Sequence, residues 1–420
     1  MSNYYDASFA SVYIMNAFEE GYRLDDGIKV NNEWIEDIYV WEALWFMIPA
    51  FKVKFTDFGM NYLNSRHIGN VVIKLGLNAK DTVTFDMANS EIKDAELSDV
   101  RRPSTVTVGL SGFGMPGLWL MGRGTKGYGM TSASYAVRTF AEGVVESKYN
   151  KLCKYLNWNE DIDQSWDSKT YLQGGRSGLA FLAYMRDCAL NKSGKQDYFT
   201  WFAPNSKQTG IAWQFNFKSL SALKNNSNLF YLEYIVNAED WDKSWSNGGY
   251  LDNNTIPFMW YEVLSRNTAL DTAKGKFAHY FYDIGSLSVA KEIVNSTGNL
   301  VGGKVKSNIV ASMLNSGDTV TGMIVDGAKV SVHGTTVEKG IFEKAKTLRK
   351  VNVVIPGVSA VSVGSRVRVI IPDGYSDVIN ALSGDWLVGG ITHIWSSKGK
   401  NYFKKLTLVS DALKSEIKGV

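Results

Sequence analysis

Two alternating runs in the last forty residues constrain the fold of this chain more than any other feature. Apolar and polar residues alternate over residues 386–395 (WLVGGITHIW) and again over residues 402–408 (YFKKLTL). Residues 396–401 (SSKGKN) lie between them, and two such runs around a short turn are typical of a β-hairpin. Further short runs at 351–355 and 365–371, separated by turns, extend the pattern and indicate a small closed barrel.

The composition favours a soluble, β-rich chain with several domains. Of its 420 residues, 45% are hydrophobic and 21% are charged, which suffices for sizeable cores and two to four domains. The net charge of +3 argues against a dedicated nucleic-acid or anionic-membrane binder, so basic pairs such as Arg101-Arg102 are read as solubilising, with contact to DNA or an acidic partner as the alternative. The 13 Trp, 21 Tyr and 20 Phe residues suit broad protein interfaces as well as cores.

Cysteine usage and targeting signals point to assembly in a reducing compartment. Cys153 and Cys188 are the only cysteines and form no CxxC pair, so we expect no disulfide and a cytosolic place of assembly. The first residues lack the basic and apolar regions of a signal peptide. The longest apolar stretch, residues 40–48, is too short for a membrane span and contains Glu42.

Helical and strand-like periods alternate in the middle of the chain, which predicts an α+β unit. Residues 131–156 carry apolar side chains at helical spacing after a Thr-Ser pair that suits an N-cap. An acidic loop is expected at 157–167, followed by a second helix over 179–189. A hairpin around residues 203–210 completes the unit.

The remaining segments complete a division of the chain into four parts. Residues 70–76 and 81–86 alternate and predict two paired strands, while 229–256 and 276–289 look like further strands. The expected domains are an N-terminal β-rich barrel domain (1–108), a Gly-rich loop and α+β domain (109–245), a mixed β-rich connecting domain (246–345), and C-terminal barrel strands completed by strands from the middle of the chain (346–420).

A glycine-rich segment contains two formal GxGxxG matches, Gly112–Gly117 and Gly122–Gly127. A dinucleotide site needs a strand before the glycines and a helix starting at them, so that free backbone N–H groups meet the pyrophosphate. Pro116 interrupts the first match, and such matches arise by chance in so glycine-dense a segment. We therefore read both as structural and expect no cofactor. A P-loop is excluded because the sequence has no Gly-Lys-Ser/Thr.

No sequence pattern marks a catalytic or metal-binding residue. The acidic run at 160–167 lacks the central glycine and the closing Glu of an EF-hand loop, so it predicts a solvated loop rather than a calcium site. The four histidines have no ligand spacing, and the motifs HExxH, GxSxG and paired Cys/His do not occur. His393 alternates with Ile391 and Trp395 and is expected to be a half-buried wall residue rather than a base.

Two segments resemble one family of phage proteins. Residues 171–185 (YLQGGRSGLAFLAYM) are similar to a pattern of the phage late control protein D family, Gln-Ser-Gly-x-Ser/Thr-x-x-x-Phe-Leu at a helix start, with Gly174 in place of the serine. The strands from Pro356 to 402–408 resemble the closing barrel of that family. The family comprises baseplate hub proteins of phage tails and the related part of VgrG spikes, and the resemblance covers about a third of the chain.

The resemblance implies a mainly β, α+β fold with two small, tail-tube-like β-barrel domains and an α+β middle region. It implies a trimeric ring whose six similar barrels face a six-fold tail tube, while the other side stays three-fold for the spike. The chain would be a non-enzymatic virion protein, the hub of a bacteriophage tail baseplate, assembled in the bacterial host cytoplasm. The implied partners are two further copies of the chain, the tail tube protein, the central spike protein and other baseplate proteins. DNA would pass through the channel without sequence-specific binding, and no membrane anchor is implied.

The residues singled out within this resemblance are structural and interface candidates, and none is assigned a catalytic, cofactor-binding or metal-binding role. Gly175 and Ser177 would permit a tight entry to a helix, and Arg176 would pair with the acidic loop. The others would anchor the helix or form the barrel wall or core. The candidates are Gly175, Arg176, Phe181, Leu182, Trp386, His393, Tyr402 and Leu406.

Two other functions stay open at the level of the sequence. A tail-associated cell-wall hydrolase needs a paired acid and nucleophile in a cleft, and no pattern marks such a pair. The spike of a contractile secretion system normally continues into a long repetitive β-helix, and the sequence shows no such repeat as far as Val420.

Overall fold

The computed structural model describes residues 8–16, 28–58, 68–77, 82–97, 105–145, 158–192, 197–205, 213–226, 229–235, 238–252, 254–258, 260–266, 276–283, 288–295, 323–325, 349–371, 383–397 and 401–410. Within these ranges, no helix is long and apolar enough to cross a membrane.

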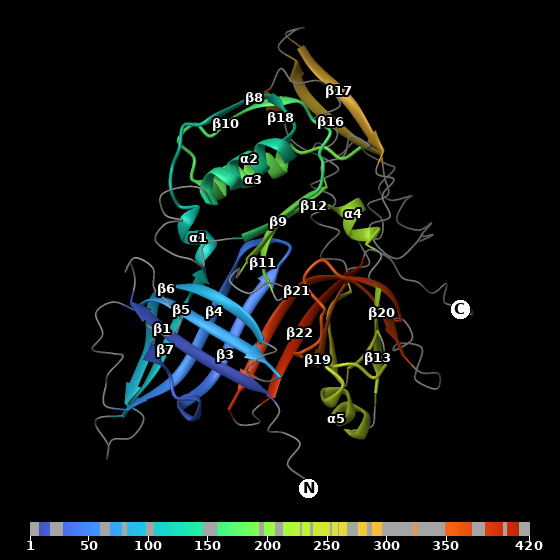
Figure 1. The fold of residues 1–420 in the computed structure, drawn as a ribbon. Coiled ribbons are helices and arrows are strands. Elements are labelled where there is room, and N and C mark those ends of the chain that lie inside the picture. Colours follow the sequence, from blue (N-terminus) through green and yellow to red (C-terminus); the bar gives the residue numbers. More distant parts are fainter. Residues whose placement is uncertain are drawn as a thin grey trace, which may run out of the picture.

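Fourteen strands form one sheet that is folded into two β bodies, which lie side by side (Figure 1). The N-terminal β body contains β1 (Phe9–Asn16), β2 (Ile28–Lys29), η3 (Asn32–Trp34), β3 (Ile35–Ala43), β4 (Phe46–Phe58), β5 (Ile68–Gly76), β6 (Thr82–Leu97) and β7 (Thr105–Gly114). The C-terminal β body contains β13 (Leu229–Tyr234), α5 (Ala238–Ser246), β14 (Thr255–Phe258), β15 (Trp260–Arg266), β19 (Arg349–Pro356), β20 (Arg366–Ile370), β21 (Gly384–Ser396) and β22 (Asn401–Ser410).

The two β bodies are joined by the pairing of β3 with β21, strands from opposite ends of the chain. The pairing is antiparallel and runs from Gly390 opposite Ala43 to Ser396 opposite Asp37. β3 forms a strand because its residues alternate: Ile38, Val40 and Glu42 are buried, and the residues between them turn outward. We call the β3–β21 pairing the seam.

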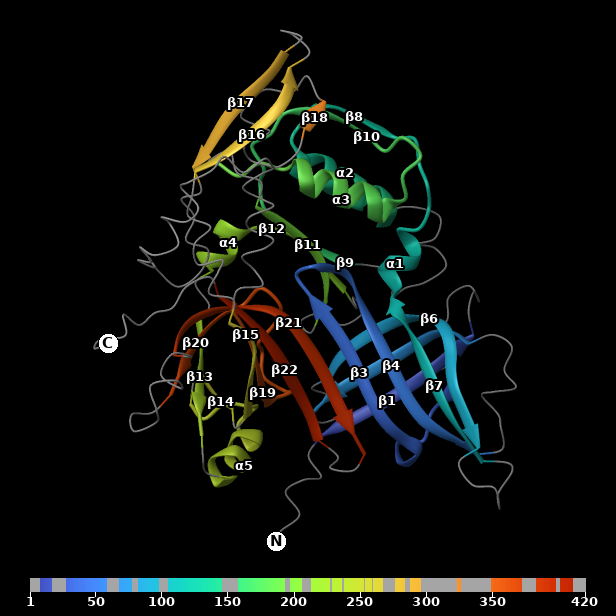
Figure 2. The same ribbon diagram turned by 180° about the vertical axis from the view of Figure 1, so that it is seen from behind.

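An α/β cap lies across one end of both β bodies, as the two opposite views show (Figures 1 and 2). It contains α1 (Met115–Trp119), β8 (Gly127–Thr131), α2 (Ala133–Val145), β9 (Trp158–Ile162), β10 (Lys169–Leu172), α3 (Gly178–Cys188), β11 (Tyr198–Pro204), β12 (Trp213–Ser219) and α4 (Leu220–Lys224). A separate three-stranded sheet lies beyond the cap and consists of β16 (Lys276–Asp283), β17 (Ser288–Asn295) and β18 (Met323–Val325).

Buried apolar side chains form two cores, one in each β body, and strand β11 belongs to both. Tyr198 and Phe202 pack in the core that the N-terminal β body shares with the cap. Phe199 and Trp201, which point to the other side of the strand, pack in the core of the C-terminal β body. β11 is therefore buried on both faces and fastens the cap to both bodies.

The structure confirms the main elements expected from periodicity and changes several of their details. The mainly β, α+β class is confirmed, as are the C-terminal hairpin, the β5–β6 pair, the second helix and the β11–β12 hairpin. The first helix is confirmed over α2, and its expected continuation beyond Val145 lies outside the described residues. The pairings among described residues leave both β bodies open, so two closed barrels stay a prediction.

β7 runs across residues 108 and 109 and continues the N-terminal sheet to Gly114, and the division into four domains stays a prediction. Two expectations are corrected. The expected acidic loop at 157–167 contains β9, which pairs in parallel with β12. The segment 229–256, expected to be strands, contains the helix α5, whose Trp241 and Trp245 pack on Phe403 of β22.

Candidate functional site

A layer of polar side chains separates the two hydrophobic cores inside the sheet. The inner face of the β21–β22 hairpin crosses both cores: Trp395 and Tyr402 pack in the N-terminal core, and Leu406 packs in the C-terminal core. Between them His393 and Lys404 face each other across the hairpin, and both are buried. His393 was expected to be half-buried but is only 1% exposed, because the N-terminal β body covers the side that the hairpin alone would leave open.

His393 makes two hydrogen bonds, one across the seam to the N-terminal β body and one within the C-terminal hairpin. Its Nε2 lies 2.9 Å from Oε1 of Glu42 on β3, and its Nδ1 lies 2.7 Å from the hydroxyl of Tyr402 on β22. A carboxylate only accepts, so Nε2 donates to Glu42 and the neutral ring accepts from Tyr402 at Nδ1. Burial raises the pKa of Tyr402 well above its usual value and keeps that hydroxyl proton in place.

Lys404 completes the layer, which we call the polar layer (Glu42, His393, Tyr402 and Lys404). Its Nζ donates to the carbonyls of Ser359, at 2.5 Å, and Val361, at 3.2 Å. Burial lowers the pKa of Lys404 to about 8, against the opposing attraction of Glu42. Among the described residues, Oε2 of Glu42 has no hydrogen-bond partner.

The polar layer holds the seam in register rather than presenting a reactive group. Glu42, His393 and Tyr402 line up as a carboxylate, an imidazole and a phenol, but their exposures of 4%, 1% and 0% leave no access for a substrate. A shift of β21 by one residue against β3 would turn His393 to the outside and leave Glu42 buried without it. The polar layer therefore selects one setting of the two β bodies.

The second glycine-rich match pairs with the motif at residues 173–178. Gly175 N–H donates to the Gly124 carbonyl at 2.8 Å, and Gly178 N–H donates to the Gly122 carbonyl at 3.1 Å. A Cβ on Gly178 would lie 2.9 Å from the Leu120 carbonyl oxygen, which explains the glycine there. The two motifs that looked independent in the sequence are thus opposite sides of one ribbon.

Gly175 and Ser177 lie in the turn that leads into α3. Gly174 and Gly175 have φ values of 55° and 79°, in the left-handed region that favours glycine. The Ser177 hydroxyl accepts from the Ala180 N–H at 3.2 Å and caps α3. Arg176 was expected to pair with the acidic loop; instead its Nη1 donates to the Leu172 carbonyl at 3.0 Å, since the turn folds it back onto β10.

The remaining candidates are core residues. Phe181 is fully buried, and its ring lies against Tyr128 and Phe140 at centroid distances of 5.7 and 5.4 Å. Leu182 lies in the same core. Trp386 is buried in the core of the C-terminal β body together with Leu406.

We expect Gly178→Ala to destabilise the chain and Gly122→Ala to leave it unchanged. The new methyl group at 178 would overlap a backbone carbonyl, and overpacking of this kind costs about 1–3 kcal/mol. At Gly122 an added Cβ meets nothing within 4 Å. Urea denaturation of both variants measures the difference, and equal midpoints would contradict a close approach of the two motifs.

In the first glycine-rich match, other parts of the protein occupy the space beside the glycines. β7 leads into α1, but α1 has only five residues and the glycines around it pack against neighbouring strands. A Cβ on Gly112 would lie 2.0 Å from the Ala88 carbonyl oxygen of β6, and one on Gly114 would lie 3.2 Å from the Trp213 ring. These glycines therefore serve close packing of the chain on itself, in line with the structural interpretation.

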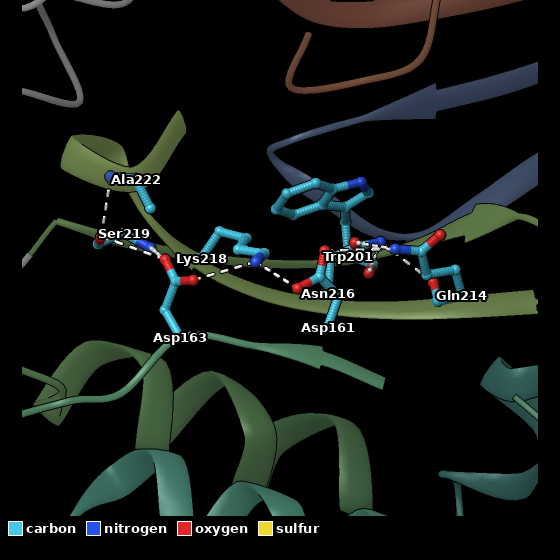
Figure 3. A network of polar contacts seen from close by, with 8 residues as sticks. All are labelled: Asp161, Asp163, Trp201, Gln214, Asn216, Lys218, Ser219 and Ala222. Carbon is cyan, nitrogen blue, oxygen red and sulfur yellow. Dashed lines mark hydrogen bonds and ion pairs between the residues drawn. The ribbon is translucent and has the colours of Figure 1, made fainter. Parts of the chain in front are cut away.

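The acidic run, expected to be a solvated loop, fastens the cap instead. Figure 3 shows Lys218 between Asp161 and Asp163, and its Nζ lies 3.0 Å from Oδ1 of Asp163. Burial lowers the pKa of Lys218, but the hydrogen bonds to both aspartates outweigh it and the pKa is raised. Asp163 also accepts from the Ser219 N–H at 3.0 Å, and Ser219 caps α4.

Asp167, at the end of the acidic run, caps α2 from a distance in sequence. Its Oδ2 accepts from the Ala133 N–H at 2.8 Å and from the Tyr171 hydroxyl, and its Oδ1 accepts from the Leu190 N–H at 3.3 Å. The carboxylate thus joins α2, β10 and the end of α3. Among the described residues, no group of three or more His, Cys, Asp or Glu side chains is placed to hold a metal ion.

Comparison with known proteins identifies the fold. No protein-family model and no curated protein matches the sequence. The tail protein from Neisseria meningitidis MC58 superimposes with a TM-score of 0.57 at 8% identity, over 97% of this chain and 98% of that one. The 43 kDa tail protein of prophage MuSo2 from Shewanella oneidensis does so with a TM-score of 0.51 at 10% identity, over 96% and 97% of the two chains. This chain has a tail-protein fold.

The tail-protein fold also occurs within a larger chain. A chain of the lidded Francisella PdpA–VgrG complex superimposes with a TM-score of 0.52 at 10% identity, and the match covers 96% of this chain but only 52% of that one. At such low identity the likeness concerns the fold alone, and it extends across both β bodies and the cap.

Sequence reasoning missed three residues that hold this tail-protein fold together. Glu42 and Lys404 belong to the polar layer, and Asp167 caps α2. Glu42 and Lys404 each lie in a strand at a position where the alternating pattern otherwise places an apolar, inward-facing residue. A charged residue at such a position is the one sequence signal for a buried polar contact. No comparable local signal marks Asp167.

Proposed function

We propose that this chain is a structural virion protein, the central hub of a bacteriophage tail baseplate. In this role three copies form a ring that adapts a six-fold tail tube to a three-fold spike, without catalysis. The observation that carries the proposal is the likeness to two tail proteins over nearly the full length of both chains. The tail tube, the central spike and other baseplate proteins would be its partners, and DNA would pass through the channel without sequence-specific binding.

Two free strand edges support self-assembly into a ring. Eight strands pair antiparallel in unbroken succession across both β bodies, in the order β6, β7, β4, β3, β21, β22, β19 and β15. At one end, β6 beyond Ala88 has no neighbour on its second edge among the described residues. At the other end, β15 has none on its second edge in the same part of the chain. Such edges pair readily with another chain.

The number of strands determines whether the edge strands of two neighbouring copies would run parallel or antiparallel. Neighbouring strands alternate in direction, so the first and the last of eight strands run opposite ways. A ring axis keeps these directions in every copy, so β15 of one copy would meet β6 of the next as one more antiparallel pair. This head-to-tail contact closes into a ring, and three copies would supply three times eight, or 24, strands to its wall.

A second candidate follows from the VgrG comparison. The match covers 52% of that chain, so this fold is one part of a longer protein there. The hub portion of a contractile secretion spike would form the same ring. It would differ from a phage hub in the part of the chain that is attached to the ring. Co-purification with a tail tube protein of a phage or with that of a secretion system distinguishes the two roles.

The proposal predicts the mass of the purified chain in solution. Light scattering at several concentrations should give three times 46.7 kDa, about 140 kDa, for a trimeric ring. Leu264 lies at the irregularity of the β15–β19 pairing and has no partner on β19, so Leu264→Pro should break the free edge with little loss of internal pairing. We expect that variant to be a folded monomer and Leu264→Ala to remain a trimer.

The opposite results are equally definite. A wild-type chain that stays at 46.7 kDa at every concentration would contradict self-assembly into a ring. A trimer that survives Leu264→Pro would place the contact elsewhere than β15. Clearing of peptidoglycan by the purified chain, lost on replacing a single Glu, would favour a cell-wall hydrolase instead.

A further inference from the structure

The polar layer lies at the seam, between the two apolar cores. A change in the charge of one of its side chains would therefore act on the contact between the β bodies and not on the packing of either core. His393 on β21 and Glu42 on β3 bond across the seam, and apolar cores lie on both sides of them. The rest of the layer, Tyr402 and Lys404, comes from β22. Each hydrogen bond between these side chains therefore either crosses the seam or joins the two strands of the β21–β22 hairpin.

The polar layer is balanced for a neutral His393. It contains one carboxylate, that of Glu42, and one ammonium group, that of Lys404, so its net charge is zero when the imidazole is uncharged. The neutral ring satisfies both of its nitrogens, donating to Glu42 and accepting from the hydroxyl of Tyr402.

A proton on His393 breaks this balance in two ways. Nδ1 becomes a donor toward Tyr402, whose hydroxyl proton then has to turn away from the ring. The layer also holds two cations for the single carboxylate of Glu42, and uncompensated buried charge is strongly unfavourable. Opening the seam to water relieves both.

Among the described residues, the groups that face His393 from its neighbouring elements supply no second counter-ion. β3 contributes Glu42, and β22 contributes Tyr402 and Lys404. β6 contributes the uncharged ring of Phe85, with its centroid 4.9 Å from that of His393. Asp86 follows Phe85 on β6 and so points to the other side of that strand.

We propose that the polar layer is a proton-sensitive joint: when His393 takes up a proton, the seam between the two β bodies opens ahead of their cores. Mild acid would then free the N-terminal β body to change its setting relative to the C-terminal one. Burial lowers the pKa of His393, so the closed seam keeps the imidazole neutral. The stabilisation is present above the pKa of 6.5 of the open state and is lost as the pH falls below it.

Hydrogen exchange of the seam amides tests the joint. Between pH 7.5 and 5.0, an open-state pKa of 6.5 raises the opening constant by at most about 30-fold, after correction for the intrinsic exchange rate. We expect this rise at residues 35–43 and 390–396, and a smaller one in β5 and β19. The matched variant His393→Gln keeps a donor for Glu42 and should show less than about a threefold rise in the seam. A full rise in His393→Gln, or none in the wild type, would overturn the proposal.

Two further variants separate a proton-sensitive joint from a merely structural contact. Lys404→Met removes the competing cation, so His393 keeps Glu42 as its own counter-ion and the acid-induced rise should shrink. Glu42→Gln removes the carboxylate, so the full rise should persist. If His393→Gln does not fold, this pair decides the matter: equal acid-induced rises in both variants contradict the joint, and the predicted order supports it.

Discussion

Replacing Glu42 with leucine should lower the free energy of unfolding by about 3–5 kcal/mol, because removal of one partner leaves a buried charge uncompensated. Lys404 would remain buried, with only the carbonyls of Ser359 and Val361 around its Nζ. His393 would lose the acceptor for Nε2 as well. Urea denaturation followed by tryptophan fluorescence measures the change.

The double variant Glu42→Leu, Lys404→Met is the control for that result. It removes the carboxylate and the ammonium group together, and apolar replacements of buried ion pairs are often neutral or stabilising. We expect it to regain most of the loss seen in the single variant. A single variant within about 1 kcal/mol of the wild type would show that the polar layer is not desolvated in solution.

Replacing Phe181 with alanine should lower the free energy of unfolding by about 3–5 kcal/mol, because the substitution leaves a large cavity in a packed core. Phe181 is fully buried where α3 packs on α2 and β8, against the rings of Tyr128 and Phe140. Leu172→Ala is the matched control in the same cap, because Leu172 is 56% exposed and its loss should stay within about 0.5 kcal/mol. An unchanged melting temperature for Phe181→Ala would exclude this residue from the core.

The sequence predicts the elements of this fold wherever a local period decides them. The alternation of residues 386–395 and 402–408 predicts β21 and β22, and helical spacing predicts α2 and α3. Local composition does not reveal α5, because aromatic residues favour strands. Its Trp241 and Trp245 lie one helical turn apart instead, and both reach Phe403.

The polar contacts that cross the seam or fasten β9 to β12 could not be predicted, because they join residues far apart in the chain. His393 and Glu42 are separated by 351 positions, and Lys218 and Asp163 by 55. A local reading assigns acidic residues to solvent, which is correct for most of them and wrong for Asp163 and Asp167. The seam itself pairs strands from the two ends of the chain, and no local pattern specifies its register.

The irregular pairing of β6 and β15 affects how readily their outer edges can pair with another chain. β6 departs from regular register with β7 between Asn89 and Glu91 and again between Lys93 and Glu96, and β15 does so with β19 between Val263 and Ser265. A bulge bends and twists its strand, so a flat edge from an unrelated chain finds few matching groups there. Newly made copies would thus resist runaway aggregation at high concentration, while a neighbour with the complementary bend still fits.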